Sequence, residues 1–220
     1  VGSATNTIAT STDGTSWTGR GTVLTNPLSV AYGNSKYVVV GESASAILND
    51  LVLTSANSNG FIVTKNSEFS GEWAWYAFDG NLSTYWTTYS SSSTVIDGNT
   101  ITGSWLQIQM RASIVITGYT ISALSPDTGR SPNIFYIAAS NNGSTWTALD
   151  FKTGYNATTW TNSSGTLSFS LSSNTNAYSY YRLVVNTNNG SSYTSIYEWS
   201  FTSTYPSQIL AYSSDLSTWT

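Results

Sequence analysis

The chain has no cysteine and no histidine among its 220 residues. Without cysteine it needs no disulfide and offers no thiol chemistry, and cysteine usage says nothing about its redox compartment. Without histidine it lacks the commonest general base and the commonest zinc ligand.

Charge is scarce as well, at 8% of residues and a net charge of −4. The 7 basic residues form neither a basic stripe nor a polybasic segment, so we expect no nucleic-acid partner and no binding to anionic lipid. No apolar run approaches the roughly 20 residues of a membrane helix. We recognise no signal peptide, and a start at Val1 rather than Met is what a mature product or a fragment would show.

Aromatic and β-branched residues are abundant instead. Aromatics make up 14% of the chain, with 9 Trp and 15 Tyr, and Thr, Val and Ile are frequent. Such residues suit pleated, half-buried surfaces, and this composition does not fit disorder. Helix-forming residues make no long periodic run, so the sequence predicts an all-β protein.

The two ends of the chain resemble each other. The start, VGSATNTIATSTDGTSWT (1–18), matches VGESAS (40–45) joined to SQILAYSSDLSTWT (207–220), so Val1 aligns with Val40 at a spacing of 40 − 1 = 39 residues. A period of about 40 is typical of four-stranded propeller blades. The segment 29–43 between the copies reads as a hairpin around a Gly-Asn turn.

The repeated turn, S-x-D-G-x-x-W, is similar to the sialidase-type Asp-box, but it has one residue fewer between Asp and Gly. We expect Asp13 and Asp215 to accept hydrogen bonds from turn amides, and Trp17 and Trp219 to pack between sheets. The sequence thus predicts propeller-like segments at 1–47 and 207–220, with a separate domain at 48–206 inserted into a repeat hairpin, where insertions are tolerated.

The central segment alternates between apolar and other residues over several short runs. Period-two alternation predicts strands with one face in a core, and turn-rich stretches separate the runs. Many short strands of this kind indicate a sandwich or jelly roll. The runs are 105–110, 135–140, 167–171 and 180–185.

Five motifs in order carry a resemblance to a known family. They are AFDGNLSTYW (77–86), WLQI (105–108), PNIFYIAASNNGSTWT (132–147), YYRLVV (180–185) and the closing IYE (196–198). Residues 48–206 resemble the discoidin (coagulation-factor type C) family, a jelly-roll sandwich that galactose-binding-like carbohydrate modules share. The resemblance implies a non-catalytic module that binds its partners outside cells.

The resemblance also implies a structural calcium ion held by Asp79, Asn81, Thr84 and Glu198. The carbonyls of Tyr76 and Tyr197 would complete the set. Calcium takes about 6–8 oxygen ligands, which suits these groups. The alternative is that Asp79 caps turn amides and Glu198 pairs with an arginine.

For ligands, the resemblance implies loops at one rim of the sandwich. The candidates are Glu72, Trp73, Tyr89, Arg130 and Tyr193. Trp73 would offer a platform for a sugar and Arg130 a forked pair of hydrogen bonds. The alternative is that the aromatics pack in strands and core, as we expect of Trp86, Trp105 and Trp146, and that Arg130 pairs with Asp127. The loop 87–100 is mostly Ser and Thr, which argues against lipid recognition.

Sequons occur at five positions, of which Asn142, Asn156 and Asn162 are the candidates for glycosylation; the other two are Asn81 and Asn189. We expect an extracellular, cell-surface or virion-surface module that binds glycans or surface glycoproteins on a repeat-built carrier. The alternatives are a structural subunit of a filament or virion surface, with copies of itself as partners, and an accessory fragment of a sialidase-like glycosidase. The arginines are scattered and no carboxylates are paired at glycosidase spacing, so we expect no enzyme activity.

Overall fold

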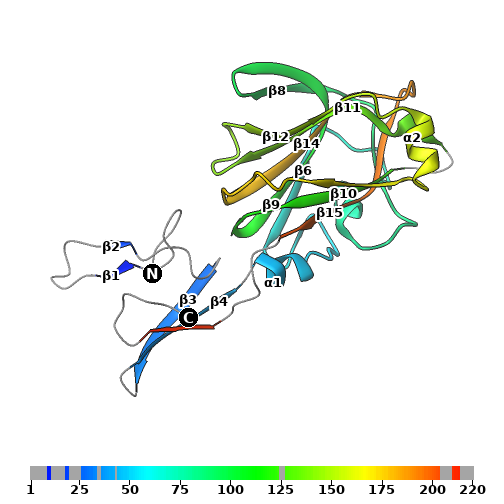
Figure 1. The fold of residues 1–220 in the computed structure, drawn as a ribbon. Helices are drawn as coiled ribbons and strands as arrows, with labels where there is room; N and C mark the ends of the chain where they lie inside the picture. The colour runs from blue at the N-terminus through cyan, green and yellow to red at the C-terminus, as the bar shows by residue number, and fades with distance from the viewer. Residues whose placement is uncertain are drawn as a thin grey trace.

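A computed structural model describes residues 47–123 and 127–203 of the chain in full (Figure 1). Outside these ranges it describes only the backbone of short elements. These are β1 (Ala9–Thr10), β2 (Thr18–Gly19), β3 (Asn26–Gly33), β4 (Lys36–Glu42), the start of α1 (Ala44–Asn49), and β16 (Leu210–Ser213).

Two antiparallel sheets form the central domain. The larger sheet has seven strands in the order β12-β11-β14-β9-β6-β5, with β8 pairing beside β9. Its strands are β5 (Asn57–Ser58), β6 (Phe61–Lys65), β8 (Ser92–Ile96), β9 (Asn99–Ile114), β11 (Pro132–Ser140), β12 (Thr147–Lys152) and β14 (Tyr178–Asn188). The smaller sheet has the order β13-β10-β15-β7. Its strands are β7 (Trp86–Thr88), β10 (Gly118–Ala123), β13 (Thr166–Ser170) and β15 (Thr194–Thr202).

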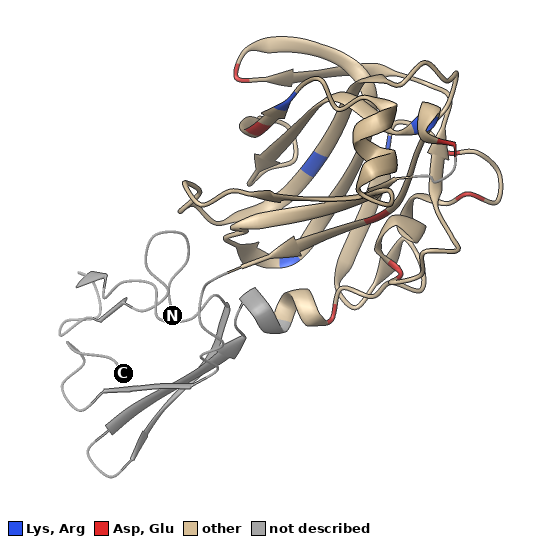
Figure 2. Cartoon of the chain, turned by 45° about the vertical axis from the view of Figure 1, so that its right-hand side comes forward, with Lys and Arg blue, Asp and Glu red and all other residues tan. Residues whose placement is uncertain are grey.

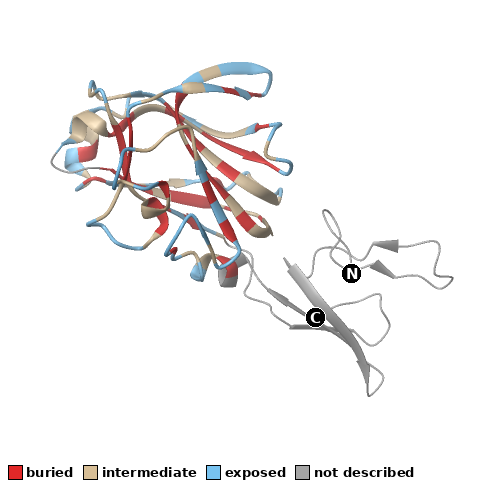
Figure 3. Cartoon of the chain, turned by 180° about the vertical axis from the view of Figure 1, so that it is seen from behind, coloured by how far each residue is buried: buried red, intermediate tan, exposed pale blue. Residues whose placement is uncertain are grey.

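The sheets pack face to face around one hydrophobic core (Figure 3). Alternate residues of the main strands enter this core, because successive side chains of a strand point to opposite faces. The larger sheet contributes buried residues such as Leu106, Phe135 and Leu183, and the smaller sheet contributes Ile121 and Trp199. The predicted all-β sandwich and its alternating strands are therefore confirmed.

Short helices connect the strands. They are α2 (Ala157–Asn162), η1 (Ala74–Phe78) and η2 (Thr128–Arg130), in addition to α1. None of the helices in the described parts of the chain has the length and apolar character needed to cross a bilayer.

The prediction that segment 87–100 is a loop is wrong, because most of it forms strands. β7 runs into it, and β8 pairs with the start of β9 in a hairpin that closes with Ile96 opposite Asn99. The two turn residues, Asp97 and Gly98, have φ values of 48° and 79°. A two-residue turn with positive φ at both positions matches the twist of a hairpin, and Asp-Gly favours it.

The repeat segments are seen only as paired strands. β3 and β4 form the predicted hairpin, with Gly33 opposite Lys36. β16 then pairs with β4 on the other side, with Leu210 opposite Val40, and β1 pairs with β2. The turn residues Asp13, Trp17, Asp215 and Trp219 lie outside the described residues, so the propeller-like arrangement stays a prediction.

Candidate functional site

Loops from both sheets meet beside β7 and the start of β15. The loop before η1 lies against β7, because the Phe69 amide donates to the Thr87 carbonyl at 2.8 Å. Within that loop the Glu72 amide donates to the Phe69 carbonyl at 3.0 Å. β7 and β15 are joined behind it by a buried hydrogen bond of 2.6 Å between the hydroxyls of Thr87 and Ser195. The strands thus give the loops a fixed base.

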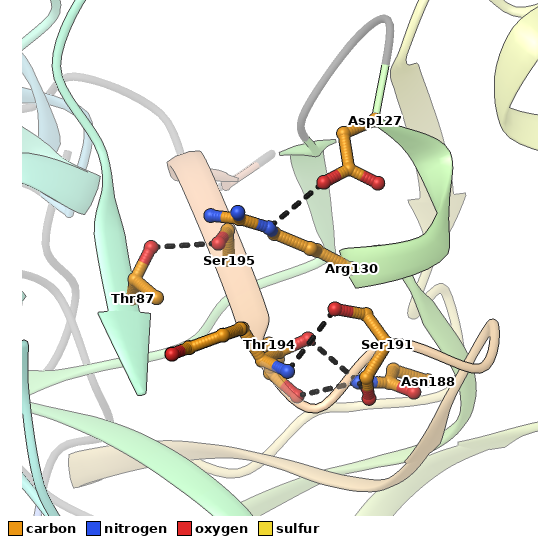
Figure 4. Close-up of polar contacts among 8 residues, drawn as sticks. Thr87, Asp127, Arg130, Asn188, Ser191, Thr194 and Ser195 are labelled. Carbon is orange, nitrogen blue, oxygen red and sulfur yellow. Dashed lines mark hydrogen bonds and ion pairs between the residues drawn. The ribbon is translucent and has the colours of Figure 1, made fainter. Parts of the chain in front are cut away.

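Arg130 lies at the end of η2, between an acidic group and a ring. Its Nε is 2.9 Å from Asp127 Oδ2 (Figure 4). The two groups form an ion pair but no hydrogen bond, because the Nε–H of Arg130 does not point at the carboxylate oxygen. This Nε is buried and has no hydrogen-bond partner. On the other side, the guanidinium carbon lies 5.1 Å from the centre of the Tyr193 ring. The expected pairing of Arg130 with Asp127 is confirmed, and it occurs together with a cation–π contact.

The loop that carries Tyr193 is held by its own asparagine. Asn188 Nδ2 donates to the carbonyls of Ser191 and Tyr193 at 2.9 and 2.7 Å (Figure 4). The Tyr193 amide donates to Ser191 Oγ at 3.1 Å. These bonds fix the loop without help from a ligand.

Aromatic rings gather at the same end of the sandwich. Phe69 lies edge-to-face against Tyr89 and Tyr193, with centroid distances of 6.5 and 6.0 Å. Tyr89, Phe69 and Trp73 remain 65%, 42% and 38% exposed. Exposed aromatic surface of this kind offers an apolar face for a ligand.

Glu72 lies near Tyr85, which contacts Tyr197; the sequence did not assign either tyrosine to the rim. The charge of Glu72 acts on Tyr85, and the Tyr85 ring lies 5.1 Å from that of Tyr197. Burial, and next the charge and hydrogen bond of Glu72, raise the pKa of Tyr85, while the charge of Arg130 lowers it. One oxygen of this carboxylate, Glu72 Oε2, is buried without a hydrogen-bond partner.

We call this set of side chains the binding rim: Phe69, Glu72, Trp73, Tyr85, Tyr89, Asp127, Arg130, Tyr193 and Tyr197. Four of the predicted candidates meet in it. Phe69 contacts Tyr89 and Tyr193, Arg130 lies over Tyr193, and Tyr85 lies near Glu72. Trp73 precedes η1 as its N-cap residue, next to Glu72, but no hydrogen bond or ring contact links its side chain to the rest of the described rim. Phe69 and Tyr85 were missed because no local pattern distinguishes an aromatic of the rim from one of the core, and Tyr197 was expected only as a carbonyl ligand of calcium.

The four residues predicted as calcium ligands form one hydrogen-bonded group, the metal loop. The Asn81 amide donates to Asp79 Oδ1 at 2.9 Å and to Glu198 Oε1 at 3.1 Å. The Thr84 hydroxyl lies 2.7 Å from Asp79 Oδ2 and 2.9 Å from the Asn81 carbonyl. The expected capping of turn amides by Asp79 is thus confirmed. The alternative of an arginine partner for Glu198 is wrong, because Glu198 faces Asp79 and the Asn81 amide.

Electrostatics at the metal loop suit a cation. The pKa of Glu198 is raised to about 7, first by burial and then by the hydrogen bond and the charge of Asp79, while hydrogen bonds from the backbone of Gly80 and Asn81 partly offset the rise. Two carboxylates that disfavour each other's ionised form fit a divalent cation, whose charge would reverse this effect. The donors are all oxygens, as calcium prefers. Asp79, Thr84 and Glu198 therefore fit the ion by side chain, and Asn81 fits it by its carbonyl.

The sequons differ in how their asparagines are engaged. Asn142 Oδ1 accepts from the amides of Ser144 and Thr145 at 2.9 and 2.8 Å, and Asn156 Oδ1 caps α2 through the Thr159 amide at 3.0 Å. Asn162 is exposed at the end of α2. Glycosylation at these three positions stays a prediction.

Comparison with known proteins gives the same fold. A carbohydrate-binding module of family 32 from Clostridium perfringens NanJ, solved with galactose, is 16% identical, with a TM-score of 0.51 over 66% of this chain and 95% of that chain. A second C. perfringens module, CpGH89CBM32-5, solved with GalNAc-β-1,3-galactose, is 14% identical, with a TM-score of 0.52 over 67% and 98%. No curated protein matches the chain in sequence.

The family profile described as "F5/8 type C domain" matches residues 62–199, which is more than half of the chain. The match lies inside the predicted domain 48–206 and includes the metal loop and the binding rim. The resemblance that we inferred from the five motifs is therefore confirmed. This chain belongs to the F5/8 type C (discoidin) family.

Proposed function

We propose that this chain is a non-catalytic, extracellular binding and adhesion module that recognises glycans through its binding rim. The observation that carries the proposal is the combination of exposed aromatic rings with Arg130 and Glu72 on loops fixed by the strands. Sugar sites need an aromatic face for C–H groups and a few fixed polar groups. The two similar modules were solved with galactose and with GalNAc-β-1,3-galactose, which supports a saccharide as ligand.

Each part of the rim has a separate role in this proposal. Phe69, Trp73 and Tyr89 offer exposed ring surface to the apolar face of a sugar. Arg130 donates from the Nη atoms that its contact with Asp127 leaves available, and Glu72 accepts from hydroxyl groups. Because Asn188 already fixes the loop of Tyr193, binding would cost little ordering entropy.

Calcium would serve the fold of the site rather than its ligand. We propose that Asp79, Asn81, Thr84 and Glu198 hold the ion, together with the carbonyls of Tyr76 and Tyr197. When bound, calcium would supply a positive charge that links the loop before β7 to β15. Asp79 and Glu198 would orient this loop. The loop follows η1, so its position would also fix Glu72 and Trp73, which precede η1.

A glycan-array screen of the full chain tests the proposal, once with calcium and once with a chelator. We expect saccharide binding that Trp73→Ala and Arg130→Ala weaken by at least about tenfold, since each removes a central contact. Phe151→Ala is the matched control, because Phe151 is 50% exposed on the edge strand β12, outside the rim. A folded chain that binds no glycan under either condition would refute the proposal.

The second candidate is a structural subunit of a filament or virion surface, whose repeat segments pair with further copies. The pairing of β16 with β4 favours it, because it places the two ends of the central domain on adjacent antiparallel strands. Such an arrangement is what insertion into a repeat hairpin requires. Size-exclusion chromatography with light scattering checks for self-association, and a monomer across a wide concentration range would count against this candidate.

A further inference from the structure

The binding rim carries more negative than positive charge. Its charged members are the carboxylates of Glu72 and Asp127 and the guanidinium of Arg130, which is 2 negative charges against 1 positive charge. Elsewhere on the domain, charged residues are few and scattered (Figure 2). On the strand that leads to the rim, Lys65 forms an ion pair with Glu68 at 3.0 Å, so this lysine is already neutralised.

Arg130 already has a carboxylate partner within the rim. Its Nε lies 2.9 Å from Asp127, and its guanidinium lies over the Tyr193 ring. An anionic ligand would have to compete with Asp127 for the same cation. The gain from pairing with Arg130 is therefore reduced before any ligand arrives.

Glu72 strengthens the negative field. Its Oε2 is buried without a hydrogen-bond donor, and its charge acts on Tyr85, whose pKa it raises. A carboxylate that is withdrawn from water is poorly screened, so its field acts at longer range than that of an exposed acid. An anionic group placed on the rim would meet this field directly.

Building on the proposed function, we infer that the binding rim selects neutral saccharides and discriminates against those that carry carboxylate or sulfate groups. Hydroxyls of a neutral sugar can donate to Glu72 and Asp127 and accept from Arg130, whereas a carboxylate can only accept. The exposed rings of Phe69, Trp73 and Tyr89 are indifferent to ligand charge. Glu72 is therefore a repulsive element toward anions, and Asp127 adds to the selection because it already occupies Arg130.

The test uses the full chain on an array that presents neutral, uronic, sialylated and sulfated oligosaccharides. The strongest neutral binder is then compared by calorimetry with its C6-oxidised uronic form, at low and high salt. We expect the uronic form to bind at least about tenfold more weakly at low salt, and the difference to shrink as salt screens the repulsion.

Asp127→Asn and Glu72→Gln each remove one rim charge, and each is expected to reduce the affinity ratio between the neutral and the uronic form by about threefold or more. Asp50→Asn is the matched control: Asp50 pairs with Arg111 at 2.7 Å and is 56% exposed, against 51% for Asp127. This control should leave the ratio of affinities for the neutral and the uronic form unchanged. Thermal denaturation shows that each variant is folded.

Preferred binding of the acidic glycans, or a ratio that neither rim variant changes, would overturn this inference while leaving the proposed function intact. Binding of no glycan of any class would overturn the proposed function and this inference with it.

Discussion

Asp79 and Glu198 accept hydrogen bonds from the same backbone amide, that of Asn81, at 2.9 and 3.1 Å. One acid lies at the end of η1 and the other on β15, so this amide links the loop to the smaller sheet. Two carboxylates at one donor repel each other unless a proton or a cation lies between them.

Calcium should therefore stabilise the chain. At a concentration of about 100 times its dissociation constant, a ligand that binds only the folded state raises the free energy of unfolding by ~2.7 kcal/mol. For a chain of this size that corresponds to a rise of roughly 5–10 °C in the midpoint of thermal unfolding. Asp79→Asn and Glu198→Gln should each abolish the rise, and Asp50→Asn should retain it. Scanning calorimetry with calcium and with chelator measures the effect. Equal midpoints of thermal unfolding under the two conditions would rule out calcium binding by the metal loop.

Arg182 is expected to stabilise the β8–β9 hairpin. Its guanidinium lies 4.1 Å from the ring centres of both Trp105 and Trp146, and its Nη1 donates to Thr94 Oγ1 at 3.0 Å. Arg182→Lys keeps the charge but loses the planar stack and the paired hydrogen bonds to Gln107. The free energy of unfolding should therefore fall by about 1–3 kcal/mol. Chemical denaturation followed by tryptophan fluorescence measures this change. A loss below about 0.5 kcal/mol would show that the sandwich does not depend on this cation.

Gly103 should tolerate alanine less well than Gly98 of the same hairpin. A Cβ at Gly103 would collide with the backbone carbonyl of Val185 on the neighbouring strand, and backbone cannot move aside. A Cβ at Gly98 meets nothing within 4 Å, so only its φ of +79° opposes alanine. We expect losses of about 2–4 kcal/mol for Gly103→Ala and about 1 kcal/mol for Gly98→Ala. Parallel urea titrations measure the two losses of unfolding free energy. A larger loss for Gly98→Ala than for Gly103→Ala would contradict the prediction.

Asn188 should matter for ligand binding without contacting the ligand. Asn188→Ala removes both bonds that hold the carbonyls of Ser191 and Tyr193, so Tyr193 and the Arg130 above it lose their fixed position. The affinity for the best array glycan should fall by about 3–30-fold. Asn186→Ala is the control, since exposed Asn186 donates instead to the Thr102 carbonyl at 2.8 Å. Equal effects of the two variants would show that loop order does not limit binding.

Local patterns were enough to predict the strands that build the core. Leu106, Ile108 and Met110 alternate in the sequence and are all buried, because period two is a property of the extended backbone itself. The β8–β9 hairpin was missed although Asp97-Gly98 is a turn signal, because the flanking serines and threonines resemble a polar loop. Asp79, Asn81, Thr84 and Glu198 were expected together because they follow a family motif, and hydrogen bonds do join them, while calcium binding by them stays a prediction.

The sequence by itself determined the all-β class, the alternating core strands and the family, since each rests on the order of nearby residues. Only the tertiary structure decided which of the many aromatics stay exposed, that Phe69 lies between Tyr89 and Tyr193, and that Tyr85 faces Glu72. The physical reason is that these contacts join loops from different strands. Their meeting depends on how the two sheets pack and twist, which no local pattern records.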